Sequence, residues 1–511
     1  MNEDDILLVR DATLKRDNMI RDTSPSDVIP TINIDSIETR VRVKKKVLNK
    51  KSKPVLLHYL TLGFIGVSVW GTLWCAFGEK WAWNGSCFRI SVVGTVAWAS
   101  GQILQDTTTL PAHLAALLTG ILARHIGFLD MREHSDIDSF LRRVYPVIIL
   151  GKGSLGWDLN YMKHHWRQVV CLGCMPWVTE VAVVATCTHF FLSFPWIWGI
   201  LLGAVYSSVS CPIIMPSVVK HGQSYGGDRN WPQLVCTAGG VDTALSVGVF
   251  GVVFTYILGE ETDTTYRYVK ACSALFVGVL LGAIWGNLAK LVPKSDYYVT
   301  ELRILFVLAG GIFCNFLTSR LGWGGTGGVA VLACNATAAM HWAEQGWKLN
   351  QNPAATTYRV LWSALEPLVF AYTGTFFVIN RSVGNTLLIG LGILCISLFF
   401  RLTVAYNMCW NLRVKERLFV CCAWTPKSIV EAVLAPLAVS TIISSQGTNP
   451  SNELLYAEDI LRLLVQAIVI TGPIGFLLTD KLGPMLLREN CKPESDPQKE
   501  ENANNSLQAE V

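Results

Sequence analysis

Charged residues are scarce in this chain: they make up 16% of its 511 residues, whereas 51% are apolar. A soluble protein of this size has no need of apolar runs along its whole length, so the composition indicates a protein that crosses a membrane many times. The net charge of +4 is small for this length and does not suggest nucleic-acid binding. A phosphate-binding loop, a cluster of metal ligands and a nucleophile–base motif are also missing, which argues against an enzyme and against a bound cofactor.

The 15 cysteines show no pattern of a disulfide framework. Most lie inside apolar runs, where a cysteine behaves as a small buried residue. No apolar run precedes the basic segment RVRVKKKVLNKKSK at 40–53, so no cleavable signal peptide is expected.

Fourteen apolar segments predict an all-α polytopic membrane protein with 13 or 14 transmembrane helices. The segments are 54–77, 86–105, 110–128, 144–157, 167–191, 195–219, 231–259, 267–292, 301–319, 324–342, 358–379, 384–406, 418–443 and 457–479. A helix needs about 20 residues to cross the hydrocarbon core. The fourth segment is shorter than this and rich in glycine, so it could be a half-span.

The segments divide the chain into a polar, basic N-terminal tail (1–53), a membrane domain (54–480) and a disordered C-terminal tail (481–511). The basic block before the first span places both tails in the cytoplasm of a plasma-membrane or endomembrane protein. Two glycosylation sequons, at Asn84 and Asn380, fall in loops on the opposite side. The loop 124–143 is an exception to this topology, because it carries four arginines on the outside.

The stretch Pro195–Gly259 contains the strongest functional signal. Ser207, Ser208, Ser210 and Pro212 interrupt one span at mid-membrane depth, where irregular backbone is tolerated only if protein covers it or it lines a cavity. The next span carries one carboxylate, Asp242. A charge there costs ~2.5–3.5 kcal/mol and usually marks an ion or proton path, although neighbouring hydroxyls could also hold Asp242 as a structural group.

An inverted repeat should supply a second interrupted helix, and the segment 358–379 is the candidate. Glu366, Pro367 and Gly374 interrupt it. Two interrupted helices that cross at mid-membrane would bring their half-helix ends together, where the partial charges help to hold ions. The alternative for 358–379 is an ordinary helix with a proline kink.

Four further ionisable residues lie inside predicted spans, and each is expensive alone. Glu180 and Arg401 come from distant parts of the chain, so we expect them to form an ion pair. Lys427 and Glu431 are four residues apart, so we expect them to share a helix face and to pair as well.

Several segments together resemble the animal NHA-type sodium/proton antiporters, which are themselves similar to bacterial NhaA-type exchangers. They are YPVIILGKGSLGWDL, MPWVTEV, VSCPIIMPSV, AGGVDTALSV, LEPLVFAYTG and FVCCAWTPKSIVEAV. The resemblance implies the NhaA-like inverted-repeat fold and a homodimer that works by alternating access. It places the crossed broken helices near 195–219 and 358–379 and the ion-site carboxylate between Ala238 and Thr243, and it matches Glu180 and Arg401 to the family's acid–base positions inside the membrane.

The chain departs from this family at one position, because the family has two consecutive aspartates where this chain has Asp242 and Thr243. A threonine offers a hydroxyl ligand but no charge. The first hypothesis is therefore exchange of Na⁺, or another monovalent cation, for H⁺, with a sodium site formed by Asp242, Thr243 and Ser208 or Ser210. The alternatives are proton-coupled transport of an anion such as Cl⁻, and a regulatory homologue that does not transport.

Overall fold

The computed structural model describes residues 52–108, 110–225, 231–259, 264–292, 298–347, 352–379, 383–446 and 451–488. Every regular element in these residues is helical, so the predicted all-α architecture is confirmed for this part of the chain. Nine of its helical segments are long and apolar enough to cross a membrane. Each of the fourteen apolar segments predicted from the sequence contains one helix or a pair of helices.

The first compact unit ends at Trp83 and contains one long helix, α3 (Ser52–Phe77), and a 3₁₀ turn, η1 (Gly78–Trp81). The 26 residues of α3 are long enough to span a bilayer. The Trp70 indole donates a hydrogen bond of 2.9 Å to the Trp81 carbonyl and fixes the turn against the helix. The predicted N-terminal tail lies almost entirely outside the described residues.

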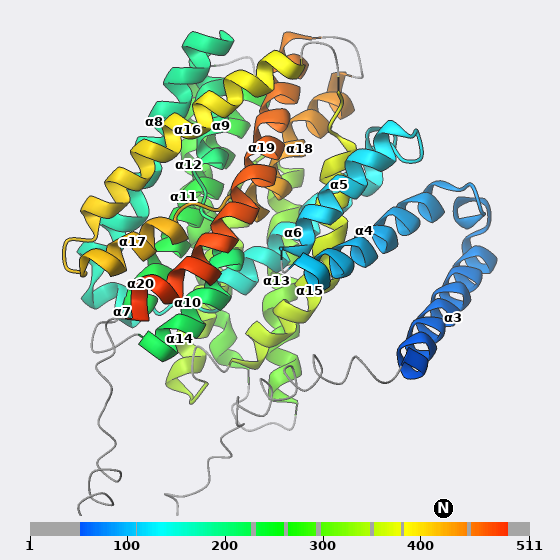
Figure 1. Ribbon diagram of the computed structural model, residues 1–511, viewed down its shortest axis with the longest axis horizontal. Coiled ribbons are helices and arrows are strands. Elements are labelled where there is room, and N and C mark those ends of the chain that lie inside the picture. The colour runs from blue at the N-terminus through cyan, green and yellow to red at the C-terminus, as the bar shows by residue number, and fades with distance from the viewer. Residues whose placement is uncertain are drawn as a thin grey trace, which may run out of the picture. The chain divides into compact units, whose positions relative to one another are not determined.

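The second unit, from residue 84, contains two successive sets of six spans joined by α12 (Thr264–Leu288) (Figure 1). The first set comprises α4 (Ser86–Thr108), α5 (Ala112–His125), α6 (Ser135–Ser154), α8 (Trp166–Leu192), the pair α9 (Trp196–Tyr206) and α10 (Cys211–Tyr225), and α11 (Trp231–Leu258). The second set comprises α13 (Val299–Arg320), α14 (Thr326–Glu344), α15 (Pro353–Thr375), α16 (Val383–Met408), the pair α17 (Val414–Ala423) and α18 (Ile429–Gln446), and α19 (Asn452–Leu477).

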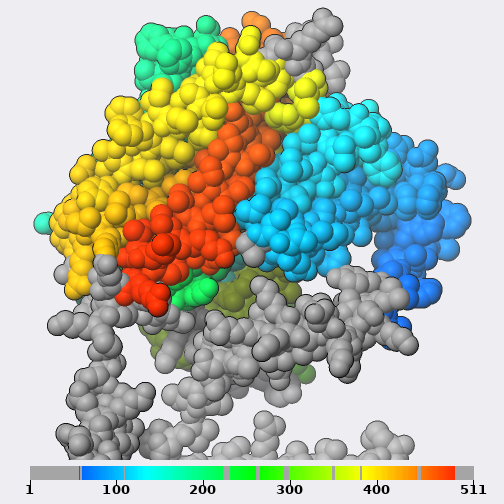
Figure 2. All heavy atoms as spheres, in the orientation of Figure 1, coloured from blue at the N-terminus to red at the C-terminus, as the bar shows by residue number. Residues whose placement is uncertain are grey.

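The two sets pack against each other in a matching order. The second segment of each set contacts the third segment of the other: α5 contacts α15, and α14 contacts α6. The two fourth segments, α8 and α16, contact each other. In both sets the fifth span is the broken one. This arrangement agrees with the inverted repeat expected for the NhaA-like fold. On the face shown in Figure 2, α19 (orange to red) lies against α16 (yellow).

Helix α6 is longer than the half-span predicted for 144–157. It begins at Ser135 and runs for 20 residues, which corresponds to a length of about 30 Å. The sequence obscured its first half because Asp138 and Arg142 make that half look like a loop. In the structure the two side chains are buried and form an ion pair of 2.8 Å within the helix.

Helix α15 is continuous, so the prediction of a second broken helix at 358–379 is wrong. Pro367 lies inside the helix without ending it, and Glu366 precedes it in the same helix. Gly374 has a different role, since a Cβ atom there would collide with the carbonyl of Leu117 on α5. This glycine allows α5 and α15 to approach closely and does not break the helix.

The arginines that violated the predicted topology are largely neutralised by carboxylates. Three of the four form ion pairs: Arg124 with Asp130, Arg132 with Glu458 at 2.8 Å, and Arg142 with Asp138 at 2.8 Å. Arg124 lies in the last turn of α5, and Arg142 and Arg143 lie within α6, so three of the four arginines belong to helices and not to a loop.

The C-terminal helical region extends slightly beyond the predicted membrane domain. A π-helical turn (Leu478–Leu482) and the short helix α20 (Gly483–Leu487) follow α19, so the chain is helical for seven residues past the boundary at 480. A short helix α7 (Leu159–His164) and two 3₁₀ turns, η2 (Met131–Glu133) and η3 (Ala289–Leu291), complete the fold. Asn84 is exposed directly before α4, whereas the sequon at Asn380 lies outside the described residues.

Candidate functional site

Two helix breaks meet in the interior of the second unit. The first separates α9 from α10 at 207–210, and the second separates α17 from α18 at 424–428. The backbone amide of Ser210 donates a hydrogen bond of 2.9 Å to the carbonyl of Pro426, so the two breaks are joined directly. The crossed broken helices are therefore α9/α10 and α17/α18. Pro212 is the second residue of α10, a position where proline is well tolerated.

Three serine hydroxyls of the first break are buried without a hydrogen-bond partner among the described residues. They belong to Ser207, Ser208 and Ser210, whose exposed fractions are at most 1%. Buried polar groups are normally hydrogen-bonded, so such a group calls for an explanation such as a bound ion or water. Oxygen atoms of this kind are ligands that suit a hard cation.

A fully buried arginine lies beside this break and joins both acids predicted from the sequence. Arg401 on α16 donates to Glu180 on α8 at 2.6 Å and to Asp242 on α11 at 2.8 Å. It also donates to the carbonyl of Ser207 at the end of α9. The predicted Glu180–Arg401 ion pair is present, but the contact of Arg401 with Asp242 is one that the sequence did not reveal.

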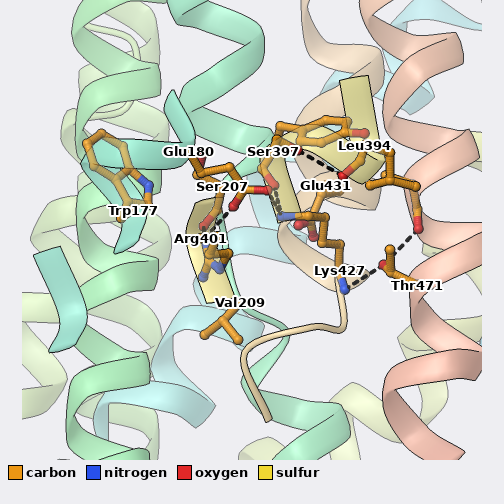
Figure 3. Close-up of polar contacts among 12 residues, drawn as sticks. Trp177, Glu180, Ser207, Val209, Leu394, Ser397, Arg401, Lys427, Glu431 and Thr471 are labelled. Carbon is orange, nitrogen blue, oxygen red and sulfur yellow. Dashed lines mark hydrogen bonds and ion pairs between the residues drawn. The ribbon is translucent and has the colours of Figure 1, made fainter. Parts of the chain in front are cut away.

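Lys427 pairs with a different acid from the one expected. Its ammonium group lies 2.8 Å from Glu180 and donates to the carbonyl of Tyr206. The prediction of a Lys427–Glu431 pair on one helix face is wrong, because Lys427 lies in the break before α18 begins. Figure 3 shows Glu180, Arg401 and Lys427 directed toward one another from different elements.

Glu431 lies in the first turn of α18 and is also fully buried. Its Oε2 atom accepts a hydrogen bond of 2.8 Å from the backbone amide of Ser428. Its Oε1 atom has no hydrogen-bond partner among the described residues. Glu431 thus acts as a cap for the start of α18 with one oxygen and leaves the other free.

These charges match the polarity of the half-helix ends around them. The last carbonyls of α9, at Tyr206 and Ser207, face Lys427 and Arg401, and the C-terminal end of a helix favours cations. The amide of Val209, just before α10, donates 2.8 Å to Asp242. The break therefore places a negative and a positive half-helix end within the same buried site.

Thr243 lies outside this charge network. Its hydroxyl donates 3.0 Å to the Gly239 carbonyl one turn earlier and lies 3.9 Å from the sulfur of Cys211 at the start of α10. The position is next to the first break, so Thr243 remains near the site without touching Asp242's ion pair. One turn beyond Asp242, the Ser246 hydroxyl accepts a hydrogen bond of 2.7 Å from the Trp177 indole.

A cavity of about 330 Å³ lies between α6, α11, α13, α14 and α18. Its lining includes Val247 and Leu434, which follow Asp242 and Glu431 by five and three residues. At 1.5 Å per residue, the backbone positions of Val247 and Leu434 lie about 8 Å and about 5 Å along their helices from those of Asp242 and Glu431. The lining also includes Arg142 and Ser440, and the Ser440 hydroxyl donates 2.7 Å to Asp138.

Glu366 does not join the buried charges and instead contacts a histidine that the sequence had not singled out. The Nδ1 atom of His113 on α5 lies 3.5 Å from Glu366, and its Nε2 atom lies 3.1 Å from the Ser428 hydroxyl in the second break. His113 is isolated in the sequence and has no partner at ligand spacing. Only the tertiary structure shows that it connects α15 to the break.

Comparison with known proteins agrees with this geometry. The family model described as "Sodium/hydrogen exchanger, transmembrane" matches residues 91–479. A sodium/hydrogen exchanger 9B1 from Macaca fascicularis is 28% identical, covering 95% of this chain and 97% of its own length. A sodium/hydrogen exchanger 9B2 from Homo sapiens is 27% identical, with coverage of 83% and 79%.

The fold is also similar to a solved structure, that of the sodium proton antiporter MjNhaP1 from Methanocaldococcus jannaschii at pH 8. The TM-score is 0.61 at 16% sequence identity, and the match covers 79% of this chain and 98% of that one. Because the family model spans more than half of the sequence, the chain belongs to the sodium/hydrogen exchanger family of integral membrane proteins.

Proposed function

We propose that this protein exchanges sodium, or another monovalent cation, for protons by alternating access. The observation that carries the proposal is the position of Asp242. It is fully buried next to the meeting point of two broken helices, near three serine hydroxyls that have no hydrogen-bond partner in the described part of the chain. An acid at such a point in an exchanger-family chain suits a site where a cation and a proton compete.

In this mechanism Asp242 and the serine hydroxyls replace the water shell of the cation. Sodium is a hard cation and prefers oxygen ligands. Arg401 orients the Asp242 carboxylate through one oxygen, and Val209 holds the other, so both carboxylate oxygens keep lone pairs for a ligand. The side chain of Thr243 stands beside the break, from which it can supply a further hydroxyl.

The charge network also defines the part of the protein that moves. Arg401 and Lys427 connect α8, α9, α11 and α16 to the second break, so these elements form one rigid body around the site. This body moves against α5, α6 and α13–α15, and the cavity lies between the two parts, with α11 and α18 on one side and α6, α13 and α14 on the other. Movement of one bundle against the other around a fixed site is the usual form of alternating access.

The assembly and orientation of the protein are part of the same proposal. We expect a homodimer in the plasma membrane or an endomembrane, with both termini in the cytoplasm. The basic block at 40–53 supports this orientation. The segment 124–143 remains the exception to it, with three of its arginines paired to carboxylates.

Purified protein in sealed liposomes with a trapped pH dye tests the exchange. An inward gradient of sodium gluconate should alkalinise the lumen as strongly as sodium chloride, whereas choline chloride should not. Asp242→Asn should abolish the response, and Asp136→Asn, the same change at an exposed position on α6, should retain it. A response that follows chloride and ignores sodium, or one that survives in Asp242→Asn, would contradict the proposal.

A further inference from the structure

Glu431 differs from the other two acids near the breaks in its contacts with the two buried cations, Arg401 and Lys427. Glu180 lies within 2.8 Å of both Arg401 and Lys427, and Asp242 lies 2.8 Å from Arg401. Glu431 has no ion pair within the described part of the chain, although its side chain is equally buried. A buried carboxylate without a partner is strongly disfavoured, so the group needs a proton or a bound cation to become neutral.

The sum of the charges in the site leads to the same residue. The buried charged residues near the two breaks are three acids, Glu180, Asp242 and Glu431, and two bases, Arg401 and Lys427. With every group ionised, the site carries one negative charge. One proton on an acid or one monovalent cation in the site makes the sum zero, so the two loaded forms are electrically equivalent.

We propose that Glu431 carries the proton that is exchanged for the cation. This assignment rests on the proposed exchange and names the acid that serves it. Asp242 stays ionised as a cation ligand because Arg401 and the Val209 amide hold both of its oxygens. Thr243, its neighbour on α11, has no titratable proton to contribute.

The proton balance of one cycle is simple. Before cation entry, Glu431 is a neutral carboxylic acid with an O–H bond at the otherwise unpartnered Oε1. When the cation binds at Asp242, this bond breaks, the proton leaves to water, and the new carboxylate balances the added charge. When the cation leaves on the other side of the membrane, a proton from water rebuilds the bond.

Groups around Glu431 tune this exchange. The Ser428 amide holds Oε2, and the Ser428 hydroxyl is held in turn by His113. The elements packed against α18 carry Asp138 and Arg142 on α6, Tyr206 on α9, Asp242 on α11 and Glu366 on α15. Other charged or titratable groups of the region are His113 on α5, Glu180 on α8, Arg401 on α16 and Lys427 in the break.

Infrared difference spectroscopy on the purified full-length protein tests the assignment directly. Spectra in sodium chloride minus choline chloride should show loss of the C=O stretch of a protonated carboxylic acid in the native protein. The band should be absent in Glu431→Gln and present in Glu431→Asp and in Glu344→Gln, a control at an exposed glutamate on α14. A sodium-sensitive band that persists in Glu431→Gln and disappears in Asp242→Asn would overturn the assignment in favour of Asp242.

Proton release in weakly buffered detergent solution gives an independent measurement. Addition of sodium should release about one proton per bound cation from the native protein, and at least about tenfold less from Glu431→Gln. Glu431→Asp should recover the release, which shows that loss in the glutamine variant does not come from misfolding. Undiminished release from Glu431→Gln would refute the assignment alone, whereas a native protein that neither releases protons nor exchanges them in liposomes would refute the proposed exchange.

Discussion

Arg401 is the residue whose removal should harm this protein most selectively. Changing Arg401→Met keeps most of the side-chain volume and removes the guanidinium that contacts two acids. Glu180 then retains Lys427 at 2.8 Å, whereas Asp242 retains only the amide of Val209. The variant should therefore be destabilised mainly through Asp242, although Glu180 makes the shorter contact with Arg401.

The loss of stability in Arg401→Met can be calculated from the cost of protonating Asp242, which must become neutral once its cation is removed. An aspartate in water has a pKa of about 3.9, so its protonation at pH 7 costs about 1.36 kcal/mol per pH unit, or about 4 kcal/mol in all. This agrees with the ~3–5 kcal/mol expected when one partner of a buried ion pair is removed. At pH 5 the same cost is only about 1.5 kcal/mol.

The sign of the pH dependence can be stated as well. The folded variant binds a proton at Asp242 that the unfolded chain releases above pH 4, so the stability lost at pH 7 returns as the pH falls. Asp242→Asn in the Arg401→Met background should recover more stability than Glu180→Gln does, because it removes the acid that has lost its cation.

Melting temperatures, measured by fluorescence-detected size exclusion after heating, compare the stabilities of these variants at pH 7.5 and pH 5. The melting temperature should rise when Asp242→Asn is added to Arg401→Met, but it should not rise when Glu180→Gln is added, because Lys427 then loses its ion pair with Glu180. The differences should shrink at pH 5. Equal rescue by both second changes, or a single variant as stable as the native protein at pH 7.5, would refute the assigned contacts.

Three further predictions concern the breaks and the helix packing. Pro426→Ala should impair exchange in the liposome assay, because alanine allows α17 to continue into the break. Pro367→Ala, in the continuous helix α15, should leave exchange intact. The reverse result would show that the functional break lies in α15 and not between α17 and α18. Gly374→Val should cost ~1–3 kcal/mol and lower the melting temperature, while Gly392→Val, with open space around it, should not. Thr243→Asp should lower the sodium concentration for the half-maximal response about fivefold, because an added carboxylate attracts the cation by ~1 kcal/mol. An unchanged concentration would exclude position 243 from the cation site.

The sequence predicted the spans well because an apolar run is a local property. It failed where tertiary contacts neutralise a local penalty. Asp138 and Arg142 suggested a loop, but their ion pair and the Ser440 hydroxyl allow them to lie inside a helix. Pro367 suggested a break, but α15 continues through it from Pro353 to Thr375.

The chemistry of the site was only partly visible from the sequence. Charges in apolar runs are rare enough that Asp242, Glu180 and Arg401 could be picked out, and the pair could be predicted because each is expensive alone. Which acid Lys427 contacts depends on where α18 begins, and a single residue at that boundary changes the direction of the side chain. His113 gave no signal, because its contacts with Glu366 and Ser428 join segments far apart in the chain.

The separation between Glu180 and Arg401 has a consequence for how the protein is made. The two residues are 221 positions apart, so at ~5–20 residues per second the ribosome needs roughly 10–40 s to synthesise the arginine after the glutamate. Asp242 precedes the same arginine by 159 positions. During this interval α8 and α11 have emerged with acids that have no cation nearby, so the insertion machinery must shelter them from lipid until α16 arrives. A nascent chain arrested after α15 should therefore remain bound to that machinery, while one arrested after α16 should be released into the bilayer.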